Sequence, residues 1–311
     1  MRKIQSTTDN SVFACKQVPL PTDRGGYLSA LREEIEVAKS LAHAHVIAID
    51  QTFRIRQTYF LVMSPVGEGN LDEFLSATEE LGNPDEQRQL LGNWILCLAN
   101  AVAYIHRRGV VHGDIKPSKI LFKGSRVLLT GIRTASFDFS DKTEGIGRRN
   151  HTIYTAAEAV DEAHPGSSAD IFSLGCVFSE IYTVCRQRSR VEYYNFRAFN
   201  RIVSYHKTIA EVNEWFAGFD QPDVDFAMSA IMPMLAPEAG HRPSSQRTIH
   251  NVVAARAEAL SPTTCFDCKS AAQAGDGTTN LIESNDDHHR DGRTVLPSFA
   301  ELDAIGWMYR S

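Results

Sequence analysis

The N-terminal part of the chain contains short runs of β-branched and aromatic residues, whereas most of the remainder shows longer amphipathic patterns. Strands are predicted over 11–18, 46–53 and 58–63, because these runs are bounded by turn-forming residues. Between the first two, apolar residues recur at helical spacing with charges opposite, which predicts a helix over 27–42. A small sheet with one helix is therefore expected at the start of the chain.

The clearest helical pattern covers residues 84–108, where the apolar side chains form one stripe. Asn83 suits its N-cap, Pro84 its first helical position and Gly109 its C-terminal end. Further elements are predicted as helices starting near Leu71 and Ser168, strands over 120–122 and 126–130, and helices over 207–217, 223–235 and 244–260. Strands followed by many helices predict an α+β domain.

The composition changes after Ser261, where Gly, Thr, Asn, Asp and Ser dominate up to residue 295. Such a segment buries too little apolar surface to fold by itself, so we predict a disordered tail. The final residues, 296–309, are apolar enough to dock on another surface.

Overall composition excludes several classes of protein. The 311 residues are 43% hydrophobic and 23% charged, which is typical of a folded globular chain. The net charge of 32 − 38 = −6 argues against a nucleic-acid partner, and no apolar run indicates a membrane partner. The N-terminus lacks the apolar core of a signal peptide, so a cytoplasmic or nuclear, intracellular location is expected. The basic clusters at 148–149 and 186–190 are interpreted as solvated loops.

The six cysteines are few and scattered, which favours a reducing compartment. Four are interpreted as small core residues: Cys15, Cys97, Cys176 and Cys185. Cys265 and Cys268, with His288 and His289 downstream, are zinc-binding residue types, but adjacent histidines do not match the usual spacing of a zinc site. No metal site is therefore predicted from these residues.

The most informative motif covers residues 111–122, VHGDIKPSKILF. It resembles the catalytic loop of eukaryotic protein kinases, H-R-D-L-K-P-x-N followed by a strand. Six other motifs of that family are matched in the same order, at 14–16 (V-A-x-K), 34 (helix Glu), 63–66 (gatekeeper and hinge), 154–158 (A-P-E), 170–175 (D-x-W-S-x-G) and 242–243 (Arg-Pro). From residue 11 to about 258 the chain is thus similar to Ser/Thr protein kinases. The residues within its motifs are similar to those of filamentous-fungal kinases.

The resemblance implies a bilobal α+β fold with a β-rich small lobe and a mainly helical large lobe. The small lobe and hinge are expected over 1–66, the large lobe over 67–260, and the tail over 261–311. Ten residues precede the predicted strand over 11–18, and none of them is Gly. The first strand and the glycine-rich phosphate loop are therefore expected to be missing, which would leave a truncated small lobe.

The resemblance also implies catalytic roles. Asp114 would accept the proton of a substrate hydroxyl, and Lys116 would hold the transferring phosphate. Glu158 and Arg242 are expected to form a structural ion pair, and Asp170 to cap its helix and bond the catalytic loop.

The nucleotide, ATP, would be held by residues of the small lobe and hinge. Lys16, paired with Glu34, would contact the α/β-phosphates. Met63 stands at the gatekeeper position, and Ser64 and Val66 belong to the hinge.

Both protein ligands of the family's Mg²⁺ are missing. The catalytic-loop Asn is replaced by Lys119, and Gly131-Ile132-Arg133 stands where D-F-G is expected, unless a two-residue deletion keeps Gly131 as the Gly of that motif. Losing about 4 kcal/mol of metal stabilisation costs roughly 10³ in rate. Asp138 and Asp141, both within the predicted loop over 136–150, are not expected to replace the missing ligands, so no metal ligand is predicted; Lys119 would instead be a fixed cation near the phosphates.

Three hypotheses follow. The first is a catalytically impaired pseudokinase that binds a protein partner through its large lobe. The second is a residually active Ser/Thr kinase that transfers the ATP γ-phosphate to a protein substrate. The third is a decayed copy without a function of its own.

Overall fold

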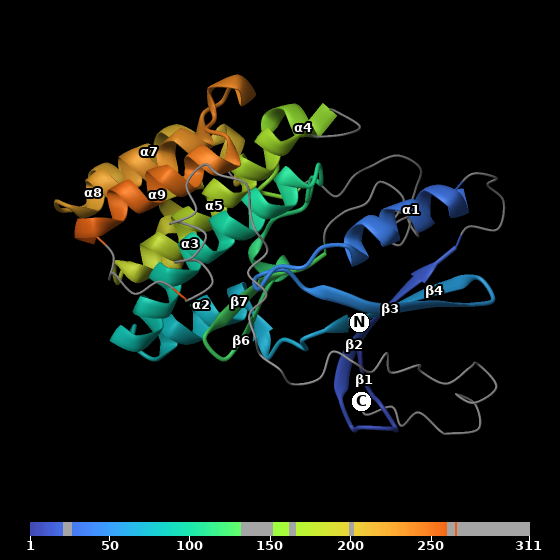
Figure 1. Cartoon of the computed structure of the whole chain (residues 1–311). Coiled ribbons are helices and arrows are strands. Elements are labelled where there is room, and N and C mark those ends of the chain that lie inside the picture. The colour runs from blue at the N-terminus through green and yellow to red at the C-terminus, as the bar shows by residue number, and fades with distance from the viewer. Residues whose placement is uncertain (21–26, 132–151, 162–165, 199–201, 260–264, 266–311) are drawn as a thin grey trace.

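The computed structural model describes residues 1–20, 27–131, 152–161, 166–198, 202–259 and 265. Most of its helices group at one side, and a four-stranded sheet with α1 (Tyr27–Lys39) lies at the other (Figure 1). The predicted bilobal α+β architecture is therefore confirmed. The predicted loop over 136–150 and most of the predicted tail lie outside the described residues, so Asp138 and Asp141 are not placed.

The larger sheet is antiparallel, in the order β1-β2-β4-β3. Its strands are β1 (Arg2–Gln5), β2 (Val12–Pro19), β3 (Ala48–Ile55) and β4 (Thr58–Ser64). Leu31 and Ile35 of α1 pack with inward-facing strand residues such as Leu61 to form a separate small core. Three of these strands and the helix follow the sequence prediction.

Strand β1 corrects the expectation that no strand precedes the one carrying Lys16. Within β1 only Ile4 is half-buried, so the hydrophobic pattern carries almost no strand signal. What defines the strand is its antiparallel ladder with β2, and the backbone N–H of Ser6 donates to the Ser11 carbonyl at 2.8 Å to close the turn.

The helical part is built around α3 (Asp85–Arg107) and α5 (Ser167–Cys185), which pack on each other in one large core. By length and composition α5 could cross a membrane, but 89% of its apolar window is buried inside the protein, as expected of a core helix. The other helices here are α2 (Leu71–Glu80), α4 (Ala157–Asp161), α6 (Arg190–Arg197), α7 (Ile209–Ala217), α8 (Asp223–Phe226) and α9 (Ser245–Ala259). The four cysteines predicted to be core residues are all buried.

Two details of helix termini differ from the prediction. The N-cap of α3 is Pro84, and Asn83 adopts a left-handed backbone with φ 56°. Helix α5 has Gly166 as its N-cap, so Asp170 does not cap it. Asn83 and Asp170 are residue types that suit an N-cap. Where a helix begins, however, depends on the path of the backbone that enters it.

A second sheet, in the order β5-β6-β7, lies beside the helical core. It contains β5 (Gly69–Asn70), β6 (Ile120–Lys123) and β7 (Arg126–Leu129). Alternate side chains of β7 enter different cores: Val127 and Leu129 belong to the helical one and Leu128 to that of the larger sheet. Strand β7 therefore lies at the junction of the two lobes, and the residues that follow it are held there.

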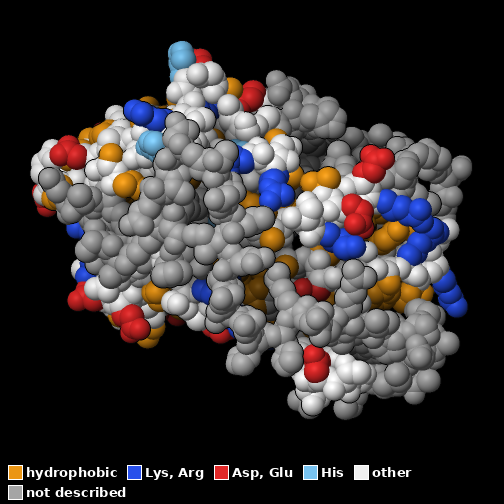
Figure 2. Space-filling view, viewed as in Figure 1, with side chains coloured by type: hydrophobic (Ala, Val, Ile, Leu, Met, Phe, Trp, Pro, Cys, Tyr) orange, Lys and Arg blue, Asp and Glu red, His pale blue; other side chains and the backbone are white. Residues whose placement is uncertain are grey.

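Basic side chains gather on the sheet end of the face shown in Figure 2, with acidic side chains beside them. At the turn between β3 and β4, the guanidinium of Arg54 donates to the carbonyl of Arg56 at 2.8 Å and to Gln57 Oε1 at 3.3 Å. The guanidinium of Arg54 therefore stabilises the turn between β3 and β4.

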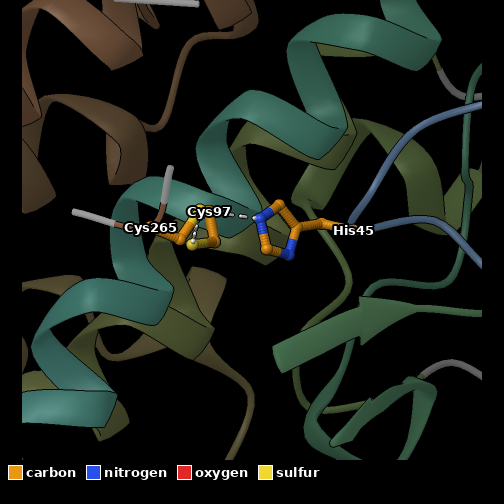
Figure 3. Close-up of side chains that lie close together, drawn as sticks. All are labelled: His45, Cys97 and Cys265. Carbon is orange, nitrogen blue, oxygen red and sulfur yellow. Dashed lines mark hydrogen bonds between the residues drawn. The ribbon is translucent and has the colours of Figure 1, made fainter. Parts of the chain in front are cut away.

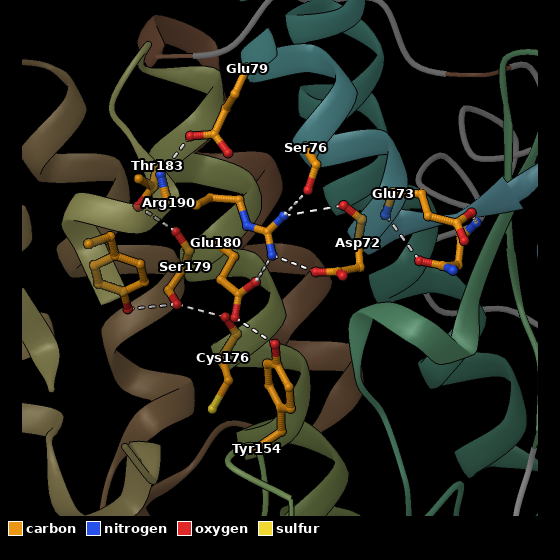
Figure 4. A network of polar contacts seen from close by, with 12 residues as sticks. Asp72, Glu73, Ser76, Glu79, Tyr154, Cys176, Ser179, Glu180, Thr183 and Arg190 are labelled. Carbon is orange, nitrogen blue, oxygen red and sulfur yellow. Dashed lines mark hydrogen bonds and ion pairs between the residues drawn. The ribbon is translucent and has the colours of Figure 1, made fainter. Parts of the chain in front are cut away.

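The predicted solvated cluster over 186–190 is wrong for Arg190, which begins α6 and enters a polar network (Figure 4). Its Nη2 lies 2.6 Å from Asp72 Oδ1 and 3.4 Å from Oε2 of the buried Glu180. Glu180 also accepts a hydrogen bond from Tyr154 at 2.8 Å. Helix α6 was not predicted, because it begins within the segment interpreted as a solvated loop, where Ser189 is its N-cap.

Replacement of Arg190 by Met is expected to lower the free energy of unfolding by about 1–3 kcal/mol, because Glu180 then loses its cation while buried. The loss stays moderate because Tyr154 still donates to Glu180. Urea unfolding checks this, with Arg188→Met as the control because Arg188 is exposed. A loss no larger than in the control would contradict the structural role of Arg190.

Candidate functional site

The loop between α3 and β6 is held by one buried carboxylate. Asp170, in the first turn of α5, accepts hydrogen bonds from the backbone N–H groups of His112 at 2.7 Å and Gly113 at 2.8 Å. The same carboxylate lies 2.8 Å from His106 Nε2. The expectation that Asp170 bonds this loop is therefore confirmed, and the loop is fixed immediately before Asp114.

His112 connects the loop to the end of β7. Its Nδ1 accepts from the backbone N–H of Asp114 at 3.2 Å, so Nε2 carries the proton and donates to the Thr130 carbonyl at 3.1 Å. Burial lowers the pKa of His112, which keeps this imidazole neutral. These two hydrogen bonds hold the backbone at Asp114 beside the backbone at Thr130, immediately before Gly131.

The carboxylate of Asp114 is engaged by two ammonium groups. Lys116 Nζ lies 2.9 Å from Asp114 Oδ1, and Lys119 Nζ lies 3.9 Å from Asp114 Oδ2. Lys119 ends the short 3₁₀ helix Pro117–Lys119, which directs its side chain back across the loop toward Asp114. Two cations and one anion therefore occupy the centre of the candidate site.

Gly131 faces the same lysine. Its backbone is left-handed with φ 77°, and a Cβ at this position would lie 3.0 Å from Cδ and 3.4 Å from Nζ of Lys119. A backbone bond from Thr130 N–H to the Lys119 carbonyl, 2.9 Å long, keeps the two segments adjacent. The side chain of Lys119 thus occupies the space that a side chain at 131 would need.

In the sequence alone, Lys119 and Gly131 are two separate departures from the motifs of protein kinases. The structure shows that they belong to one arrangement, because a long cationic side chain packs where the glycine leaves room. Ile132 and Arg133 lie outside the described residues.

The residues predicted to hold a nucleotide lie on the larger sheet and on the segment after it. Lys16 is half-buried on β2, opposite Leu61 of β4, and Met63 is buried opposite Ala14. Ser64 ends β4.

The peptide between Ser64 and Pro65 is cis, and Val66 packs against the core of this sheet. Glu34 lies in α1, but its side chain is outside the described residues, so the pairing of Lys16 with Glu34 stays a prediction.

The predicted ion pair between Glu158 and Arg242 is confirmed. The two guanidinium nitrogens lie 2.5 and 3.0 Å from the two carboxylate oxygens. Arg242 also donates to the backbone carbonyls of Ala236, Pro237 and Ser168. Burial raises the pKa of Glu158, but the hydrogen bonds and charge of Arg242 outweigh this and bring it below its ordinary value.

The arrangement has a limited chemical repertoire. Asp114 is a carboxylate at the correct place for a general base, yet both of its oxygens contact ammonium groups. Carboxylate and amide oxygens are the ligands that Mg²⁺ prefers, and position 119 offers an ammonium while position 131 offers no side chain. The site can attract an anion more readily than a divalent cation.

Comparison with known proteins agrees with the motif order. A family model described as "Protein kinase domain" matches residues 1–252. The chain is similar to a serine/threonine-protein kinase 33 of Bos taurus, 28% identical over 177 residues, which is 53% of this chain and 35% of the relative.

Two further relatives give similar figures. A probable protein kinase of Dictyostelium discoideum is 30% identical over 187 residues, covering 58% of this chain and 51% of the relative. A cyclin-dependent kinase 2 of Caenorhabditis elegans is 29% identical over 181 residues, covering 56% and 47%. The matches thus span about half or less of the length of these curated relatives.

Proposed function

The chain belongs to the protein kinase family, and on this premise we propose that it is a pseudokinase: a kinase domain that binds a protein partner through its large lobe and does not transfer phosphate with Mg²⁺. The single observation that carries the proposal is the position of Lys119 Nζ, 3.9 Å from Asp114 Oδ2 and packed against Gly131. One side chain thereby removes a metal ligand and places a positive charge beside the catalytic-base position.

Electrostatics support the proposal. The charges of Lys116, Lys119 and Asp114 sum to +1 at neutral pH. A cation about 4 Å from a metal is repelled by roughly 4 kcal/mol per unit charge at an effective dielectric constant of 20. Since Mg²⁺ carries two charges, this repulsion amounts to roughly 8 kcal/mol and opposes metal binding beside Lys119.

A protein partner is supported by the surface of the large lobe. Helix α6 exposes Val191, Tyr194 and Phe196, and aromatic residues are enriched where proteins contact each other.

A phosphotransfer assay tests the proposal. The full chain is incubated with labelled ATP, Mg²⁺ or Mn²⁺ and a generic basic protein, beside the variant Asp114→Asn. We expect no transfer above that of the variant. Phosphate transfer that is clear in the unaltered chain and lost in Asp114→Asn would show a working kinase and contradict the proposal.

A second candidate is supported by the same ammonium. Lys119 would neutralise phosphate charge as a fixed cation, so that ATP binds without a metal and a residual Ser/Thr kinase activity remains. Under this alternative the transfer would persist in a chelator, and Lys119→Met would abolish it.

A further inference from the structure

Three side chains outside the kinase cleft bring metal-binding atoms together (Figure 3). His45 lies in the segment between α1 and β3, Cys97 lies on α3, and Cys265 follows α9. Their ligand atoms all lie within 4.8 Å of one another, and His45 and Cys97 are buried. The three segments are far apart in the sequence, so their convergence is a product of the fold.

The separations fit a tetrahedral ion. Cys97 Sγ lies 3.6 Å from Cys265 Sγ, and His45 Nε2 lies 3.2 Å from Cys265 Sγ. With zinc–sulfur bonds of about 2.3 Å, two sulfurs on one zinc tetrahedron are about 3.8 Å apart. An ion can therefore enter with small side-chain adjustments.

The imidazole of His45 is already oriented for coordination. Its Nδ1 lies 2.8 Å from the Val127 carbonyl, which can only accept, so Nδ1 carries the proton and Nε2 presents its lone pair to the sulfurs. A carbonyl on the other ring nitrogen is the usual support of a metal-bound histidine. The backbone is fixed as well, because Leu129 N–H donates to the His45 carbonyl at 2.8 Å.

We propose that His45, Cys97 and Cys265 bind one Zn²⁺ ion, which attaches Cys265 to α3 and to the segment between α1 and β3. One nitrogen and two sulfurs are a donor set that zinc prefers. Two thiolates neutralise the charge of the ion, which lowers the cost of burying it. Its fourth ligand would be water.

The assignment differs from the pairing considered from the sequence, in which Cys265 stood with Cys268 and the two histidines downstream. Those three residues lie outside the described part. The partners found in the structure come from the domain itself, a combination that no local spacing motif encodes.

Metal titration tests the proposal. The reduced, metal-free full chain is titrated with Zn²⁺ against a chromophoric chelator, and with Co²⁺, whose thiolate charge-transfer and visible bands report tetrahedral sulfur ligation. We expect one equivalent to bind. Cys265→Ser and Cys97→Ser should each weaken binding at least about 100-fold, since even loss of a supporting partner costs 10–100-fold. His45→Gln should do the same.

The control is Cys185→Ser, because this buried thiol donates to the Arg88 carbonyl and a hydroxyl can do likewise. It should bind as the unaltered chain does. Binding that survives Cys97→Ser and His45→Gln would place the metal in the tail alone and overturn the proposal. If the unaltered, cooperatively folded chain binds no metal, the cluster is only a thiol–imidazole hydrogen bond, and the proposal is overturned as well.

Discussion

The double variant Lys119→Asn/Gly131→Asp is expected to transfer phosphate from MgATP about 10³-fold faster than the unaltered chain. The two changes remove the ammonium beside Asp114 and supply one amide and one carboxylate oxygen, which are suitable Mg²⁺ ligands. Regaining about 4 kcal/mol of metal stabilisation corresponds to this factor. Asp is among the residues that tolerate a left-handed backbone such as that of Gly131.

The effects of the two single variants on phosphate transfer are not expected to add up to the effect of the double variant. In Gly131→Asp alone, the new Cβ meets Lys119 Cδ at 3.0 Å, and the new carboxylate pairs with the ammonium instead of a metal. No gain in transfer is therefore expected from it. Radiolabelled phosphate transfer at fixed ATP, compared across the unaltered chain, both single variants and the double variant, measures the effect.

A matched control is available on the neighbouring hairpin. Lys123→Asn/Gly124→Asp makes the same residue changes, and Gly124 is also left-handed but has open space around it. This control should leave transfer unchanged. If the control rises as much as the double variant, or if the gain survives Asp114→Asn, the assignment of positions 119 and 131 to the metal site is contradicted.

Replacement of Arg242 by Met is expected to lower the free energy of unfolding by about 3–5 kcal/mol, the usual cost of breaking a buried ion pair from one side. The Arg242 side chain is 0% exposed, and the change leaves Glu158 and three carbonyl groups without their donor. Chemical denaturation of both proteins measures it. Arg247→Met, in the exposed part of α9, should change stability by less than about 0.5 kcal/mol.

The same pair has a pH signature. The pKa of Glu158 lies below its ordinary value in the folded protein, so its contribution is fully present above the unfolded pKa, near 4.5, and is lost as the pH falls through the folded pKa. The stability difference between the unaltered chain and Glu158→Gln should therefore shrink on acidification below pH 4.5. A difference that stays constant over that range would mean that Arg242 does not stabilise the ionised carboxylate.

The sequence predicted those parts of the fold that hydrophobic periodicity encodes. Helices α3 and α5 and strands β2 and β4 carry continuous apolar stripes or runs, and they lie where expected. Elements held by polar contacts or by backbone pairing were missed. Strand β1 has one half-buried side chain, and α6 begins in a segment interpreted as solvated, with Ser189 as its N-cap and Arg190 reaching the buried Glu180.

Motif order places Asp114, Lys116 and Lys119 in one loop, and the structure brings their charged groups together, while their roles stay predictions. What the sequence could not provide is contact between loops. The packing of Lys119 against Gly131 depends on the left-handed turn after β7, and the approach of Cys265 to His45 depends on the path of the chain after α9. Both are three-dimensional properties without a local sequence signal.

The central claim is that an ammonium group stands where the kinase fold otherwise holds a divalent metal. Thermal melting of the full chain with ATP, in Mg²⁺ and in chelator, tests it most directly, because a ligand at 100 times its dissociation constant stabilises a fold by about 2.7 kcal/mol. We expect ATP to give the same melting temperature in Mg²⁺ as in chelator. A stabilisation by ATP that requires Mg²⁺ would contradict the claim.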